Sequence, residues 1–124
     1  MPLVEIYRDP KHADDDTTVK IRDSAHKAVA THLKMNMDDV VLRVYDVGPF
    51  DKNYSIISIE VDTGPGKDGC RQETKDELAK VISADIIKDA VIPPEWIGPL
   101  KSDLWLKILG GSAFLPLGRP DLAH

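Results

Sequence analysis

The octet PLVEIYRD at residues 2–9 returns in altered form as SIISIEVD at residues 55–62. Both octets are rich in the apolar and β-branched side chains that favour β-strands. A second pair of similar segments follows, LRVYDVG at 42–48 and LKILGG at 106–111, and each ends in glycine. The sequence therefore predicts a repeated unit that begins and ends with a strand.

Helical sequence lies between the strands of each unit. Apolar residues recur at helical spacing over 21–33 in the first half and over 78–90 in the second. A β-α-β unit normally joins two parallel strands by a right-handed crossover. We therefore predict an α/β (α+β) fold in which two tandem β-α-β units, at about 2–48 and 55–110, form a four-stranded sheet with two helices on one face.

The second face of this sheet and the end of the chain both point to an oligomer. The strands are apolar in both phases, with Leu42 and Val44 in one and Val41 and Tyr45 in the other. Two helices cover one face only, so other subunits are expected on the second. The tail GGSAFLPLGRPDLAH at 110–124 predicts a hairpin or arm that packs on a neighbouring subunit. The 124 residues are otherwise expected to form a single domain.

Composition narrows the classes of function. The chain is 42% apolar and 30% charged, as in folded domains, and its net charge of -5 with scattered lysines and arginines argues against nucleic-acid binding. No stretch reaches the ~20 apolar residues that span a membrane, and no signal-peptide pattern is present, so we expect a cytoplasmic protein without a membrane partner. The single cysteine, Cys70, and the spacing of the four histidines predict no metal site, and no cofactor is expected.

Pro2 directly follows the initiator methionine. Small residues at this position permit methionine excision, after which Pro2 carries a free secondary amine. An α-amino group has a pKa near ~7.7–8.0, and burial or a nearby cation lowers that value toward neutrality. Such an amine is suited to move a proton beside a carbonyl group. If Met1 is retained, the nitrogen is an amide and this chemistry is lost.

The Met-Pro start, the paired β-α-β units and the glycine-flanked Phe114 resemble the tautomerase superfamily, whose best-known member is 4-oxalocrotonate tautomerase. Its short members are single units that form hexamers, and this chain is similar to a double-length member, which implies a homotrimer. The resemblance also implies cofactor-free chemistry on small carboxylic acids. Since Ser55 stands where Pro2 stands in the first half, each chain supplies one amine.

Because the implied substrates are carboxylates, cationic side chains near Pro2 are expected to bind them. Arg43 and Lys107 occupy equivalent strand positions in the two halves. Arg71 lies in GCRQETK, a segment that resembles the family's GR…ETK with the arginine displaced by one residue. Arg8 ends the first strand in the same phase as Pro2. For each of them the structural alternative is a side chain that extends to the surface.

Two further residues are implicated by the resemblance. Phe114 corresponds to a hairpin phenylalanine that keeps the family's pocket apolar. The alternative role for Phe114 is packing in an interface between subunits. His32 lies on the apolar face of the first predicted helix, twelve residues after Lys20, a spacing similar to that of a functional histidine in a dehalogenase of the superfamily. The alternative is that His32 has a structural role, with its hydrogen bonds made within the core.

The reaction is predicted from the acidic residues. Hydration and dehalogenation need a carboxylate that activates water, and in similar dehalogenases it lies in the C-terminal half. Here Glu95 is the last glutamate, and only Asp103 and Asp121 follow. Ketonisation of an enol needs no water, so a tautomerase is predicted. The alternatives are a hydratase, dehalogenase or decarboxylase of a small unsaturated acid on the same scaffold, and a non-catalytic oligomeric binding protein.

Overall fold

The computed structural model describes residues 2–52, 55–64, 71–96 and 104–109, and the predicted arm at 110–124 lies outside them. Within these ranges the chain forms the strands β1 (Leu3–Arg8), β2 (Val41–Asp46), β3 (Ile57–Asp62) and β4 (Leu104–Leu109). Two long helices, α1 (Asp15–His32) and α2 (Gln72–Ala90), connect them, with short 3-10 turns η1 (Met37–Asp39) and η3 (Pro94–Trp96). The order β1-α1-β2 followed by β3-α2-β4 confirms the predicted pair of β-α-β units.

The described strands form a four-stranded sheet in the order β2-β1-β3-β4. Strands β1 and β2 are parallel, as are β3 and β4, whereas β1 and β3 are antiparallel. Leu3 therefore lies in register with Val41 on one side and with Asp62 on the other. The start of β1 meets the start of β2 and the end of β3, so this end of the sheet gathers segments from both halves.

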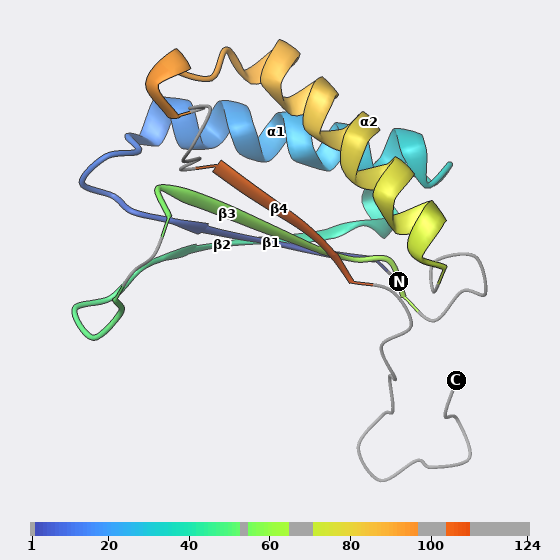
Figure 1. Ribbon diagram of the computed structural model, residues 1–124, viewed down its shortest axis with the longest axis horizontal. Coiled ribbons are helices and arrows are strands. Elements are labelled where there is room, and N and C mark those ends of the chain that lie inside the picture. Colours follow the sequence, from blue (N-terminus) through green and yellow to red (C-terminus); the bar gives the residue numbers. More distant parts are fainter. Residues whose placement is uncertain (1, 53–54, 65–70, 97–103, 110–124) are drawn as a thin grey trace, which may run out of the picture.

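Both helices lie on one face of the sheet, as predicted (Figure 1). The alternate strand residues that point to the helices are at most 1% exposed: Val4, Ile6, Ile57, Ile59 and Val61. They pack against a helical stripe that includes Ile21, Ile82 and Ile86. The period of two in the strands and of 3.6 in the helices thus brings one apolar layer against another.

The helices begin with different caps. The side chain of Asp14 accepts a hydrogen bond from the backbone N–H of Thr17 at 2.8 Å, and Asp15 and Asp16 add negative charge in the first turn. The Asp14 carboxylate satisfies one free N–H group, and all three carboxylates lie at the positive end of the helix dipole. Arg71 occupies the N-cap position of α2 without a side-chain hydrogen bond to the helix.

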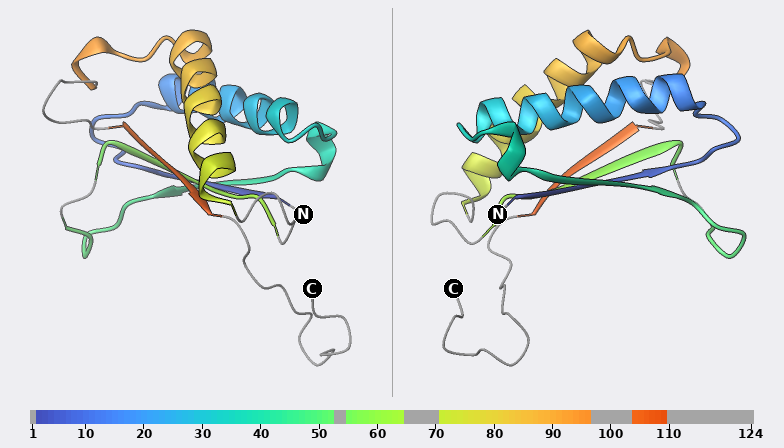
Figure 2. Two further views of the ribbon diagram at one scale, coloured as in Figure 1. Left: turned by 45° about the vertical axis from the view of Figure 1, so that its right-hand side comes forward. Right: turned by 180° about the vertical axis from the view of Figure 1, so that it is seen from behind.

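The other face of the sheet is uncovered by the described helices, which both views in Figure 2 place on one side. Trp105 is 58% exposed there, and Tyr45 is 37% exposed. Tyr7 and Tyr45 stack on this face with ring centroids 5.2 Å apart. The uncovered face therefore carries exposed aromatic side chains together with the charged residues Glu5, Arg43, Glu60 and Lys107. Among the described helices, none combines the length and apolarity needed to cross a membrane.

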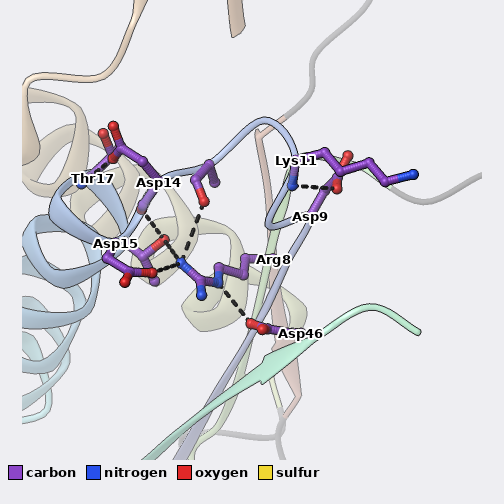
Figure 3. Close-up of polar contacts among 9 residues, drawn as sticks. Arg8, Asp9, Lys11, Asp14, Asp15, Thr17 and Asp46 are labelled. Carbon is purple, nitrogen blue, oxygen red and sulfur yellow. Dashed lines mark hydrogen bonds and ion pairs between the residues drawn. The ribbon is translucent and has the colours of Figure 1, made fainter. Parts of the chain in front are cut away.

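Asp9 fixes the turn between β1 and α1. The residue is 4% exposed, and its backbone N–H donates to the carbonyl of Ile56 at 2.8 Å. Its carboxylate accepts from the backbone N–H of Lys11 at 3.0 Å (Figure 3). It also accepts from the His12 ring at 2.5 Å. The hydrogen bond from His12, with that from Lys11, lowers the pKa of Asp9 against the opposing effect of burial.

We expect Asp9→Asn to lower the free energy of unfolding at pH 7 by about 1–3 kcal/mol, since the charge that strengthens two part-buried hydrogen bonds is lost. A lowered pKa in the folded state means that the carboxylate stabilises the fold above the unfolded value of about 3.9. That stabilisation is lost as pH falls through the lowered folded value. Urea unfolding at stepwise pH should therefore show a weaker acid dependence in Asp9→Asn than in the parent.

The matched control is Asp16→Asn, which removes the same charge from an exposed position in the first turn of α1. It should lower stability by less than about 1 kcal/mol, the range for one charge at a helix N-terminus, and should weaken the acid dependence less than Asp9→Asn does. Equal acid dependence in the parent and in Asp9→Asn would contradict the role assigned to Asp9.

Candidate active site

Pro2 lies at the beginning of β1 and is buried. Its carbonyl accepts a hydrogen bond from the backbone N–H of Val41, the first residue of β2, at 3.1 Å. By strand alternation Pro2 continues the phase of Val4 and Ile6, which face the helices. The pyrrolidine ring is thus held in position, and water has limited access to it.

Arg71 lies at the same end of the sheet as Pro2. Because β3 is antiparallel to β1, the end of β3 and the following helix start are close to the start of β1. In Figure 1 the first turn of α2 lies at the end of the sheet where β3 ends. Arg71 is exposed at the cap of that helix. The topology thus brings one of the predicted cations to the end where Pro2 lies.

Arg43 and Lys107 lie on the uncovered face of the sheet. They are in register with Glu5 and Glu60, respectively, in the strand phase opposite to that of Pro2. Both side chains are exposed. Within one chain, strand alternation therefore directs these two cations away from the side on which Pro2 lies.

Arg8 lies at the other end of β1, about 20 Å from Pro2 at the usual rise per strand residue. Its guanidinium donates to Asp46 and to Asp15, each at 2.7 Å, and to the hydroxyl of Thr18 at 3.2 Å (Figure 3). These carboxylates raise the pKa of Arg8, and the side chain is 15% exposed. Arg8 therefore links β1, β2 and the start of α1, and the fold does not bring it to Pro2.

His32 occupies the last turn of α1 and faces the second helix. Its Nε2 lies 2.7 Å from a carboxylate oxygen of Asp85 in α2. The side chains are 27% and 42% exposed, respectively. This contact joins the two helices. Phe114 lies outside the described residues.

Two acidic residues that were missed in the sequence lie on the segment that leads into β2, at the end of the sheet that holds Pro2. Asp38 and Asp39 are exposed in η1, which ends two residues before Val41. Since the N–H of Val41 donates to the carbonyl of Pro2, the backbone of η1 lies close to the N-terminus. The sequence signal was the acidic pair directly before the second strand, outside the C-terminal half in which a water-activating carboxylate was expected.

No family model matches the chain, and a search of curated proteins finds no match. Solved structures do match. A malonate semialdehyde decarboxylase, described with decarboxylase and hydratase activities, is 16% identical with a TM-score of 0.61, over 95% of this chain and 92% of that chain. N1, a member of the cis-3-chloroacrylic acid dehalogenase family, is 12% identical with a TM-score of 0.61, over 87% of this chain and 73% of that chain.

A fused 4-OT, described as an asymmetric trimer, is 13% identical with a TM-score of 0.60, over 94% of each chain. These neighbours are tautomerase superfamily proteins, and most are enzymes. The chain has the tautomerase superfamily fold, which confirms at the level of architecture the resemblance found in the sequence.

Proposed function

We propose that this protein is a cofactor-free tautomerase of a small enol or 2-oxo acid, with the Pro2 amine as the proton-transfer group. The observation that carries the proposal is the burial of Pro2 at the end of the sheet where α2 begins with Arg71. Removal of Met1 at this position creates a secondary amine with a fixed direction. Limited hydration disfavours its ammonium form and keeps it available as a base.

The proposed reaction needs one base and one anion-binding group. Arg71 binds the substrate carboxylate through its guanidinium. The Pro2 amine takes the proton of the enol hydroxyl while the carbonyl forms, and the resulting ammonium returns a proton to the adjacent carbon. The amine is thereby regenerated, and no redox partner or water molecule is consumed.

The direct test is ketonisation of phenylenolpyruvate, followed by absorbance, with protein whose mass confirms the loss of Met1. Turnover above the rate of the buffer supports the proposal. A protein that retains Met1 in its native host, or that lacks turnover with a free Pro2, would instead favour the non-catalytic binding protein.

Arg71→Ala tests the assignment of the carboxylate-binding residue. We expect KM to rise at least about tenfold, since a charge-assisted pair with the substrate is lost, with a smaller change in kcat. The matched control is Arg22→Ala, an exposed arginine on α1 that pairs with Asp23. Steady-state kinetics gives kcat and KM for both variants. Equal KM values in Arg71→Ala and Arg22→Ala would exclude Arg71 as the carboxylate-binding residue.

Asp38 and Asp39 favour a second candidate function, the hydration or decarboxylation of a small unsaturated or 2-oxo acid. A carboxylate near the base can activate water, and the matching decarboxylase is described with hydratase activity. The acetylenic acid 2-oxo-3-pentynoate, which inactivates one structural neighbour, separates the two candidates. A tautomerase base adds to the triple bond and gains the mass of one reagent, whereas a hydratase adds water and releases the dioxo acid.

We further propose a homotrimer. The uncovered sheet face carries exposed aromatic side chains, and the fused 4-OT structures that match this chain are trimers. Three copies provide three Pro2 sites, because the second half of each chain begins with Ser55. Sedimentation equilibrium measures the number of copies directly.

A further inference from the structure

His26 of α1 binds the segment that leads from η1 into β2. The ring is half-buried, and its Nε2 lies 3.0 Å from the carbonyl oxygen of Met37 and 2.9 Å from that of Val40. A carbonyl oxygen only accepts hydrogen bonds, so Nε2 carries a hydrogen and donates it to both oxygens. Nε2 carries this hydrogen in one neutral tautomer and in the charged ring alike, so the contact does not depend on the charge of His26. The ring therefore serves as a hydrogen-bond donor and not as a proton carrier.

The two carbonyls that accept from His26 belong to the two ends of η1. Met37 is the first residue of this turn and Val40 is its C-cap, and the N–H of Val40 donates to the same Met37 carbonyl at 3.1 Å. Hydrogen bonds within a 3-10 turn have poorer geometry than those of an α-helix. A donor from α1 that binds both ends of the turn thus fixes η1 against the long helix.

The hydrogen bonds continue from His26 to Pro2. The carbonyl of Val40 and the N–H of Val41 belong to the same peptide group, and this N–H donates to the carbonyl of Pro2 at 3.1 Å. One planar peptide group therefore connects the His26 ring with the first residue of β1's ladder. Hydrogen bonds in such a chain polarise and strengthen one another, so donation by His26 makes the Val41 N–H a better donor toward Pro2.

The position of Pro2 depends on this connection. After removal of Met1, Pro2 is the first residue, and its amine must stay outside the sheet to act on a substrate. Its carbonyl therefore joins it to β2, next to the pair Leu3 and Val41. The first residues of a chain are poorly ordered unless they are tied down. A misplacement of about 1 Å at a reacting group can cost about 100-fold in rate, so a loose ring is a poor base.

We propose that His26 is the positioning residue of Pro2, because it holds the peptide group between Val40 and Val41 and thereby fixes the direction of the amine. It acts through this peptide group and not on the substrate. The inference rests on the proposed function and adds to the site a residue from the middle of a helix.

His26→Leu and His26→Gln test the proposal. Glutamine carries an N–H donor at the same number of bonds from Cα as Nε2 of histidine, whereas leucine carries none, and the two have similar helix propensities. In His26→Leu we expect the Val41 amide to exchange its hydrogen at least about tenfold faster than in the parent, as measured by NMR. We also expect kcat for phenylenolpyruvate to fall about tenfold with KM within about twofold, since Arg71 is unchanged. His26→Gln should restore both properties.

Two controls separate positioning from a general loss of stability. Exchange at Val41 is compared with exchange at Ile59 of the central strand β3 in each variant, so an effect on global unfolding cancels. Ile86→Ala removes a core side chain that borders Leu104, at the end of the sheet opposite Pro2. It should leave kcat within about twofold of the parent, because the folded site is unchanged. If His26→Leu fails to fold, His26→Asn replaces it, because its donor stops short of the carbonyls.

Each outcome bears on the proposal. Faster exchange at Val41 and a lower kcat in His26→Leu, both restored in His26→Gln, support it. Unchanged exchange at Val41, an unchanged kcat, a glutamine variant that behaves like leucine, or an equal loss of kcat in Ile86→Ala would overturn it. If the parent itself lacks turnover, the proposed function fails, and exchange at Val41 alone then decides whether His26 positions Pro2.

Discussion

Pro2→Ala is expected to lower the turnover of phenylenolpyruvate about 100-fold, the lower range for loss of a positioned acid–base group. Alanine also provides an amine after removal of Met1, but a primary amine without the ring that fixes its direction. The ring is buried at the start of β1, so its removal also admits water around the nitrogen. The measurement is kcat at constant pH, on protein whose mass confirms the loss of Met1 in both parent and variant.

Pro10→Ala is the matched control for this prediction. Pro10 is exposed in the turn that follows β1, at the end of the sheet opposite Pro2. Its replacement should change kcat by less than about twofold, as for most surface substitutions. A turnover that is indifferent to Pro2 would remove the proposed mechanism and leave the hydratase or binding alternatives.

The helices and strands were predictable because apolar residues recur in the sequence at the spacing that is typical of each element. The octets at 2–9 and 55–62 contain β1 and β3, and the apolar repeats at 21–33 and 78–90 fall largely within α1 and α2. The boundaries differ by a few residues. They depend on local caps, such as Asp14, whose hydrogen bond to Thr17 starts α1 well before the first apolar repeat.

The candidate site was less predictable because it depends on how the strands are arranged. The alternation of side chains along a strand correctly predicted that Arg8 and Pro2 lie on the same side of β1. Alternation does not predict whether two residues lie at the same end of the sheet. The antiparallel pairing of β1 with β3 brings Arg71 to the end that holds Pro2. The parallel pairing of β1 with β2 likewise brings Asp39 there, although it is far from Pro2 in sequence. The parallel pairing follows from the β-α-β pattern, whereas the antiparallel pairing of β1 with β3 does not follow from any local pattern in the sequence.

A second large effect is expected in the core. Ile86 and Ile87 are neighbours on α2, yet Ile86 is 2% exposed and Ile87 is 43% exposed. Ile86→Ala should lower the free energy of unfolding by about 2–4 kcal/mol, through lost burial and the cavity that remains. This is a large part of the roughly 5–15 kcal/mol that holds a typical domain together. The midpoint of urea unfolding should fall accordingly, with little change in the slope m.

Ile87→Ala is the control, because it makes the same chemical change on the same helix and carries the same change in helix propensity. The loss of stability should be clearly smaller than for Ile86→Ala, since 43% of Ile87 is already in contact with water, against 2% of Ile86. The difference in unfolding free energy between the two variants therefore measures the burial of the side chain against the sheet, because the effects on the helix itself are the same in both. Equal losses would show that α2 does not pack on the sheet through Ile86, and the helix layer described above would then be wrong in its orientation.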